Sequence, residues 1–475
     1  MEKIMTLHPD VDTAVALACD AADAWAGSDG LRRAALLDRL AEALENDRPA
    51  LVALADSETH LGAARLNGEL DRTCFQLRGF ASLARDGGFY GRIDDPAVAG
   101  PPPAGRPDLT RVRVPLGPVA MFSASNFPFA FSVLGGDTAS ALAAGCPVVV
   151  KGHPAHIGLS RRVHQLAQGV LRSLELPEGL IGHIDLDTHA AGLELVAHPG
   201  IQAVAFTGSL AGGQALGRQA QARSQPIPFY GELGSVNPVV VLPEALEADR
   251  GSLAKTLAAS ITQGSGQFCT SPGLLMMLDS LDARALVGQL AVEIDQIGLH
   301  RMLSERIHQG YVQGVAALKR HPEVRTLTSA ASTEGAGNGF VGLVSAAAFL
   351  ADQALRHEVF GAACVCVLAT SLDELCAVLA AVGGSLTTTL LGADGGGERD
   401  RRVFRIAQKI SGRVLFQGMP TGVAVTHAQH HGGPWPASTQ PLFTSVGFTA
   451  SDRFLRPVAL QDAPLWLMER CGVPV

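Results

Sequence analysis

The 475-residue sequence predicts an α/β protein in which parallel strands alternate with helices. Two observations support this prediction. Short runs of Val, Ile, Ala and Leu alternate along the chain with longer helical stretches, as expected when helices cover both faces of a parallel sheet. Hydrophobic residues make up 47% of the chain, which is enough to bury a large core. At roughly 100–200 residues per domain, we expect two or three domains.

The first 110 residues are predicted to be mainly helical and then extended. From residue 10 to residue 80 apolar side chains recur at helical spacing, as at Leu36, Leu40 and Leu44. The segment 92–110 is rich in proline and glycine, which interrupt helices. We therefore expect an extended connection there.

Two alternating blocks of strand and helix follow. In the first block the expected strands are residues 112–114, 118–122, 146–150, 180–184 and 203–206. Its expected helices are residues 133–144, 156–174 and 188–197, with another after residue 209. In the second block the expected strands are 239–242, 274–278 and 364–369, and the expected helices are 250–263, 282–298 and 371–382. The tail, 440–475, shows no clear helix of its own.

The composition argues against several classes of protein. The formal net charge is −8 and no run of Lys or Arg occurs, so nucleic acid is not expected as a partner. The N-terminal sequence lacks the pattern of a secretory signal, and no apolar run is long enough to span a bilayer, so no membrane association is expected. The eight cysteines are scattered without a CxxC pair, which predicts buried thiols in a cytoplasmic protein without a metal site.

Three polar turns each follow a short apolar strand. They are Ser123–Pro128, Lys151–Pro154 and Phe206–Ser209. In a doubly wound sheet ligands bind at the carboxyl ends of the strands, and a turn that opens a helix offers backbone N–H groups to phosphate. No GxGxxG motif occurs at these turns, so each one taken alone is also compatible with a tight turn that binds nothing.

A cysteine and a glutamate stand in glycine-rich segments. Cys269 lies in GSGQFCTSPG and Glu232 lies in GELGSVNP. Glycine neighbours let a substrate approach closely, as a cysteine nucleophile and a general base both require. Taken alone, a cysteine such as Cys269 is more often a buried thiol, and a glutamate such as Glu232 is more often a surface or ion-pair residue.

Six motifs in one order resemble those of the aldehyde dehydrogenase superfamily. They are SNFP at 125–128, VVVKGHP at 148–154, FTGS at 206–209, GELGSVNP at 231–238, GQFCTSPG at 266–273 and EVFG at 358–361. The resemblance covers about residues 10–470 and implies an aldehyde dehydrogenase-like fold. Its expected parts are a Rossmann-type cofactor domain (1–96 and 116–233), an α/β catalytic domain (234–432), and a small β oligomerisation element with the C-terminal tail (97–115 and 433–475).

The resemblance also implies a role for each motif. Cys269 would attack the aldehyde carbon, Asn126 and the Cys269 N–H would hold the oxyanion, and Glu232 would activate the water that hydrolyses the thioester. In the cofactor site the expected residues are Lys151 and His153 near the adenine-side ribose, the turn Thr207, Gly208 and Ser209 at the pyrophosphate, and Glu358 with Phe360 at the nicotinamide-side ribose.

Two positions depart from the family pattern. Many NAD-specific members carry an acid three residues after the lysine, where this chain has Pro154. Without a carboxylate to repel a 2′-phosphate, we expect NADP to be accepted or preferred, with NAD also used. His153 or Arg218 is a candidate to help, although His153 is also readable as a structural turn residue. Ser125 replaces the tryptophan that many members place before the catalytic asparagine.

Within the superfamily the chain most resembles the 2,5-dioxopentanoate (α-ketoglutarate semialdehyde) dehydrogenases. Segments 70–89, 125–156, 225–239 and 416–439 carry this resemblance. NADP-linked long-chain fatty aldehyde dehydrogenases share much of the pattern and are the near alternative. A keto-acid substrate needs a cationic or hydrogen-bonding end to its pocket. The candidates for that end are Arg72, Gln76, Arg78 and Gln429.

The remaining expectations concern histidines, alternatives and assembly. His427, His430 and His431 are interpreted as a loop near the substrate entrance and not as a metal site. A CoA-acylating enzyme would not need Glu232, and a non-catalytic protein on the same fold would not keep every motif intact, so simple aldehyde oxidation is favoured. The family forms dimers and dimers of dimers, which implies a homodimer or homotetramer.

Overall fold

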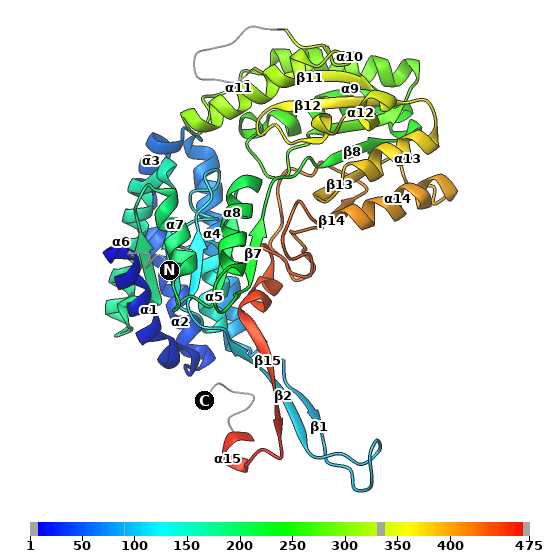
Figure 1. Ribbon diagram of the computed structural model, residues 1–475. Helices are drawn as coiled ribbons and strands as arrows, with labels where there is room; N and C mark the ends of the chain where they lie inside the picture. The colour runs from blue at the N-terminus through cyan, green and yellow to red at the C-terminus, as the bar shows by residue number, and fades with distance from the viewer. Residues whose placement is uncertain (1–7, 90, 330–337, 469–475) are drawn as a thin grey trace, which may run out of the picture.

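Three β-sheets organise the chain, and each occupies its own region of the molecule (Figure 1). The computed structural model describes residues 8–89, 91–329 and 338–468. A five-stranded sheet lies in the lower body, a seven-stranded sheet lies in the upper body, and a three-stranded sheet projects as an arm. The predicted α/β class, with parallel sheets covered by helices, is confirmed.

Four helices precede the first sheet, in the region predicted to be helical. They are α1 (Pro9–Ala26), α2 (Gly30–Asn46), α3 (Arg48–Thr59) and α4 (Ala63–Arg85). The side chain of Asp29 caps α2 by accepting a hydrogen bond from the Arg32 N–H. The leucine stripe of α2, including Leu36, Leu40 and Leu44, is fully buried and packs in the core of the lower body.

The five-stranded sheet is parallel throughout, in the order β5-β4-β3-β6-β7. Its strands are β3 (Val119–Phe122), β4 (Val148–Lys151), β5 (Ile181–Ile184), β6 (Ala203–Thr207) and β7 (Phe229–Glu232). Its helices are α5 (Gly136–Ala144), α6 (Ile157–Ser173), α7 (His189–Ala197) and α8 (Leu210–Gln221), with short 3-10 turns η1 (Pro154–His156) and η2 (Glu178–Leu180). Because all five strands run in the same direction, their carboxyl ends lie at the same edge of the sheet.

The seven-stranded sheet follows the order β10-β11-β12-β9-β8-β13-β14, with only the edge strand β10 antiparallel among the described strands. Its strands are β8 (Pro238–Val241), β9 (Leu274–Leu278), β10 (Arg325–Thr326), β11 (Phe340–Ser345), β12 (Ala363–Ala369), β13 (Ser385–Leu391) and β14 (Ser411–Leu415). Its helices are α9 (Pro243–Thr262), α10 (Leu281–Gln296), α11 (Glu305–Arg320), α12 (Ala346–Ala351), α13 (Leu372–Ala381) and α14 (Glu398–Ile410), with 3-10 turns η3 (Gln263–Gly266) and η4 (Gln353–Arg356). Cys364 and Cys366 are buried on β12, as predicted.

The arm joins segments from the two halves of the chain. Strands β1 (Ile93–Asp95), β2 (Leu109–Pro115) and β15 (Leu455–Gln461) form an antiparallel sheet that extends away from both bodies (Figure 1). The expected extended connection at 92–110 thus includes a short strand.

Another part of the C-terminal tail lies outside the arm. Segment 433–446 packs against the lower body instead, where the Leu233 N–H donates to the Ala437 carbonyl and the Gly231 N–H donates to the Thr439 hydroxyl. Turn η5 (Phe448–Phe454) and helix α15 (Leu465–Met468) flank β15. Within the described part of the chain no helix is long and apolar enough to cross a membrane.

Candidate active site

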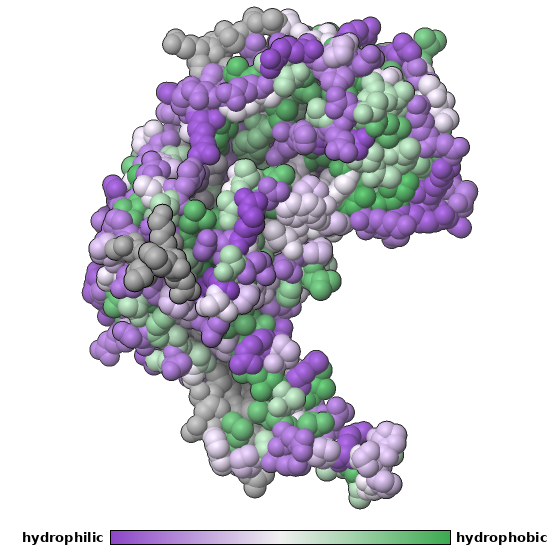
Figure 2. Space-filling view, viewed as in Figure 1, coloured by the Kyte–Doolittle hydropathy of each residue, from purple (hydrophilic) through white to green (hydrophobic). Residues whose placement is uncertain are grey.

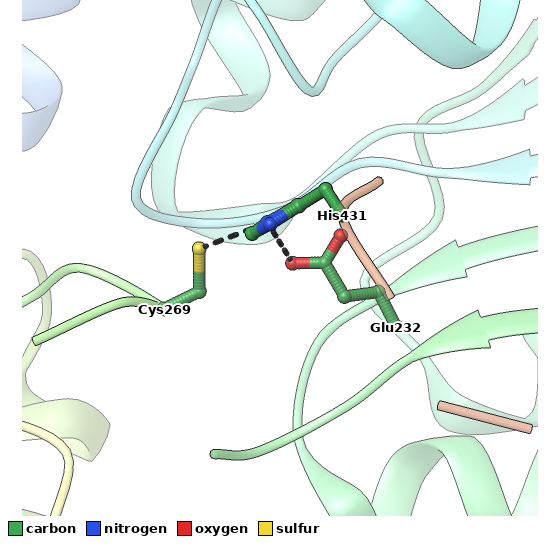
Figure 3. A group of neighbouring side chains, drawn as sticks. All are labelled: Glu232, Cys269 and His431. Carbon is green, nitrogen blue, oxygen red and sulfur yellow. Dashed lines mark hydrogen bonds and ion pairs between the residues drawn. The ribbon is translucent and has the colours of Figure 1, made fainter. Parts of the chain in front are cut away.

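Three side chains from distant parts of the chain converge at one place (Figure 3). Glu232 is the last residue of β7, Cys269 lies in the loop between η3 and β9, and His431 lies in the segment before the tail. The His431 Nε2 atom is 2.9 Å from Oε1 of Glu232 and 3.5 Å from Sγ of Cys269. A carboxylate, an imidazole and a thiol therefore share one small space.

The loop that carries Cys269 folds tightly because glycine allows it. Gly266 has φ +73°, and a Cβ there would lie 2.2 Å from backbone atoms of Gly361 and Ala362. Only a glycine lets the cysteine loop approach the chain that bears Glu358 so closely. Its glycine-rich sequence thus reflects contact between two backbone segments as well as access to the thiol.

The surroundings lower the pKa of Glu232 and raise the pKa of Cys269. Burial raises the pKa of Glu232, but the neighbouring His431 and hydrogen bonds from His431 and Ser445 outweigh it and hold the pKa below its usual value. Burial and the Glu232 charge raise the pKa of the Cys269 thiol well above its usual value, although Arg72 opposes them. The free enzyme therefore holds an ionised carboxylate beside a protonated thiol at neutral pH.

Asn126 lies beside the cysteine loop. Its buried side-chain Nδ2 donates a 3.0 Å hydrogen bond to the backbone carbonyl of Gln267, two residues before Cys269. Its own backbone carbonyl accepts a 2.6 Å hydrogen bond from Arg65 on α4. The amide named from the sequence is thus near the nucleophile, and α4 fixes the turn that carries it.

His431 differs from what the sequence suggested. The interpretation as a loop histidine near the substrate entrance is wrong for this residue, because it is only 1% exposed and contacts both Glu232 and Cys269. Its backbone N–H donates to the Thr444 hydroxyl, and its carbonyl accepts from the Ser445 N–H, so the tail holds it in place. The three side-chain donors lie within 4.8 Å of one another and could also hold a metal ion, so the absence of a metal site stays a prediction.

The residues expected to bind the cofactor lie at the carboxyl ends of β4 and β6. Lys151 ends β4, and burial lowers the pKa of its ammonium group. Thr207 ends β6, and its Oγ1 is buried without a hydrogen-bond partner among the described residues. Ser209 caps α8 by accepting from the Gly212 N–H. An orphaned hydroxyl and a helix N-terminus at one sheet edge suit a phosphate-bearing ligand.

His153 is placed at the start of η1 and is neutral. Burial, together with His156, Lys151 and Arg306, lowers the pKa of its imidazole to about 3. Its Nδ1 accepts a hydrogen bond from the Ala155 N–H, which is the structural turn role weighed from the sequence. His153 therefore supplies no positive charge. Arg306 of α11, which was not predicted from the sequence, also lies near this site. Its Nη1 atom is 3.3 Å from Nε2 of His189.

Glu358 and Phe360 line a hollow beside the cysteine loop. Gly266 and Phe268 of that loop line the same hollow, as does Ser235, whose backbone N–H donates to the Glu358 carboxylate. Leu274, Ala363 and Val365 of the seven-stranded sheet line the hollow as well.

The four candidates for the far end of the substrate pocket separate into two pairs. Arg78 forms a salt bridge with Glu45 on the surface, and one N–H of the Gln429 amide donates to the Ala424 carbonyl. Arg72 and Gln76 instead lie on the inner face of α4, with buried nitrogen atoms that have no hydrogen-bond partner in the described chain.

The fold and this site define an NAD(P)-dependent aldehyde dehydrogenase. The chain belongs to the aldehyde dehydrogenase family, whose sequence model matches residues 5–410. It is 45% identical over 459 residues (96% of this chain and 87% of the relative) to alpha-ketoglutaric semialdehyde dehydrogenase 2 of Azospirillum brasilense. It is 40% identical over 446 residues (91% and 82%) to alpha-ketoglutaric semialdehyde dehydrogenase of Acinetobacter baylyi.

Solved structures support the fold. A putative aldehyde dehydrogenase from Burkholderia cenocepacia superposes with a TM-score of 0.77 at 22% identity, covering 96% of this chain and 92% of that one. A 1-pyrroline-5-carboxylate dehydrogenase from Thermus with bound NAD superposes with a TM-score of 0.77 at 19% identity, covering 95% and 85%.

Proposed function

We propose that this protein oxidises 2,5-dioxopentanoate (α-ketoglutarate semialdehyde) to 2-oxoglutarate with NADP or NAD as the oxidant. The contact of Glu232 and His431 with Cys269 supports the chemistry, because it joins a nucleophile to a base that can activate water. The two relatives at 45% and 40% identity, both α-ketoglutaric semialdehyde dehydrogenases, support the substrate.

The first bond forms between Sγ of Cys269 and the aldehyde carbon. The thiol proton passes to the ionised carboxylate of Glu232, whose oxygen lies within 4.8 Å of the sulfur. The Asn126 amide and the Cys269 N–H then stabilise the oxyanion, and each such donor is typically worth about 3–4 kcal/mol. For this the Asn126 Nδ2 exchanges its present partner, the Gln267 carbonyl, for the substrate oxygen.

Hydrolysis of the thioester is the task of Glu232. When bound, NAD(P)⁺ accepts the hydride that leaves the substrate carbon. Glu232, which has returned its first proton to solvent, removes a proton from water, and the oxygen attacks the thioester carbon to release the carboxylate and the thiol. His431 acts as a positioning residue, because its Nε2–H donates to Glu232 and keeps it ionised and aimed at the sulfur.

The cofactor residues fit a dinucleotide. Lys151 would hold the adenine-side ribose, Thr207 with Gly208 and Ser209 the pyrophosphate, and Glu358 with Phe360 the nicotinamide-side ribose. We further propose that NADP is used at least as well as NAD. Pro154 supplies no repulsive carboxylate, and Arg306 brings a guanidinium close to His153.

We infer that the protein is cytoplasmic and forms at least a homodimer, with the arm as the contact between subunits. The arm exposes the apolar side chains of Ile93 and Val98, and Figure 2 shows apolar residues interspersed with polar ones on it. A strand at the edge of a projecting sheet is also open to pairing with another chain. Gel filtration with light scattering tests this, and a monomer would refute it.

The decisive assay follows reduced cofactor with 2,5-dioxopentanoate, in parallel with hexanal and decanal, with NADP and with NAD. Cys269→Ala is the control. We expect a Cys269-dependent rate with 2,5-dioxopentanoate that far exceeds the rate with either simple aldehyde. A preference for decanal would place the enzyme with the fatty aldehyde dehydrogenases instead.

A further inference from the structure

Helix α4 turns a polar face toward the catalytic loops. Arg65, Glu69, Arg72 and Gln76 recur at helical spacing along it, and all four carry buried polar atoms. Two of them are committed to structure. Arg65 donates to the Asn126 carbonyl at 2.6 Å, and Glu69 accepts the backbone N–H groups of Phe129 and Ala130 at 2.7 and 2.9 Å.

Arg72 has no such commitment. Its Nε and Nη2 atoms are buried and have no hydrogen-bond partner among the residues that the structure describes. Its guanidinium carbon lies 5.6 Å from the ring centre of Phe131 and 5.8 Å from that of Phe127. Cation–π contacts with these two rings therefore help to position the guanidinium. Buried donors without acceptors are costly, and a guanidinium fork matches a carboxylate in two parallel hydrogen bonds.

The position of Arg72 connects it to the reaction. Its guanidinium interacts electrostatically with Cys269 and Glu232 of the catalytic site and with Glu69 on its own helix. Phe127, which contacts Arg72, packs against Phe268 of the cysteine loop with ring centres 5.4 Å apart, and both rings belong to one apolar cluster with Phe131. One turn further along α4, the buried Nε2 of Gln76 is a second donor without a partner in the described chain.

We propose that Arg72 binds the carboxylate at the far end of the substrate while the aldehyde carbon lies at Cys269, which selects short aldehydes that end in a keto acid. This inference rests on the proposed function and names the group that recognises the acid end. An apolar aldehyde would bring no anion to this guanidinium.

The test compares two aldehydes of equal chain length, 2,5-dioxopentanoate and pentanal, on Arg72→Met. Methionine keeps most of the contact with the aromatic rings but removes the charge. We expect kcat/KM for 2,5-dioxopentanoate, relative to that for pentanal, to fall roughly 10- to 100-fold, mainly through KM, as expected for a lost hydrogen bond to a charged group. Glutarate, used as a competitive inhibitor, should weaken in parallel.

The matched control is Arg78→Met on the same helix, where the arginine pairs with Glu45 on the surface. It should leave both substrates within about twofold of the wild type, as surface ion pairs contribute little. If Arg72→Met does not fold, Arg72→Lys should shift the same ratio less strongly but in the same direction, because lysine cannot form the two-pronged contact.

The outcomes separate the two proposals. If Arg72→Met leaves the ratio of kcat/KM for 2,5-dioxopentanoate to kcat/KM for pentanal unchanged, the role of Arg72 is overturned. The proposed function still stands in that case, provided that the wild-type enzyme oxidises 2,5-dioxopentanoate. A wild-type enzyme that oxidises pentanal but not 2,5-dioxopentanoate would overturn the proposed function itself.

Discussion

The imidazole Nε2 of His431 lies 2.9 Å from Oε1 of Glu232, and both side chains are almost completely buried. The interaction keeps the pKa of Glu232 below its usual value although burial alone would raise it. The base of the reaction therefore depends on a residue that the chain supplies from its C-terminal segment.

Replacing His431 should move the pH dependence of the reaction. In His431→Gln the lowering influence is lost and burial dominates, so the pKa of Glu232 rises and its protonated form persists to higher pH. Because the ionised form is the base, the acid limb of the kcat profile should shift to higher pH. Steady-state kcat across the pH range measures this. His427→Gln, on an exposed histidine, should leave the profile where it is, and an unmoved profile in His431→Gln would remove the positioning role.

The charge of Glu232 should be visible in the reactivity of the thiol. It contributes to the raised pKa of Cys269, so Glu232→Gln should lower that pKa and speed alkylation by iodoacetamide at a fixed mildly alkaline pH without cofactor. The same variant should lose on the order of 10²–10⁴ in kcat, because general-base catalysis is removed. Slower alkylation would contradict the electrostatic account. Cys269→Ala reports the background labelling of other thiols.

The sequence predicted those parts of the site that depend on local pattern. Cys269 and Glu232 stand out because glycines surround them, and those glycines correspond to close backbone contacts such as that of Gly266 with Gly361. Strands β4 and β6, which carry expected cofactor residues, were also predicted, because they are short uninterrupted apolar runs with small residues nearby, whereas β7, which ends in Glu232, was not.

What was missed depends on contacts between distant segments. The buried strand β13 reads SLTTTLL, and its three threonines hide the apolar signal of a central strand. His431 lies in a histidine-rich loop, and only its packing against the segment that contains Thr444 and Ser445 buries it beside Glu232. No spacing in the sequence reports that packing.

The tail is also tied to the lower body by a buried ion pair. Arg453 donates to Oδ1 of Asp137 at 2.7 Å, with both side chains nearly inaccessible. Arg453→Met should destabilise by roughly 3–5 kcal/mol, because it leaves a buried carboxylate without its partner. A lower thermal midpoint in calorimetry checks this. Arg284→Met, which breaks an exposed pair with Asp279, should cost at most about 1 kcal/mol. Equal effects of the two variants would refute the argument.

A carboxylate introduced just after β4 should shift the cofactor preference from NADP toward NAD. Pro154 begins η1 three residues beyond Lys151, where the expected ribose contact lies, and the neutral His153 beside it contributes no charge. Pro154→Glu places an anion where the 2′-phosphate of NADP would bind, and like charges in contact cost several kcal/mol. We expect KM for NADP to rise roughly tenfold or more while KM for NAD changes only a few-fold, measured with one aldehyde at saturation. Pro199→Glu introduces the same charge at an exposed turn and should leave the ratio unchanged. If Pro154→Glu raised both KM values equally, the carboxylate would be distorting the turn, and the preference would have to arise from another part of the cofactor site.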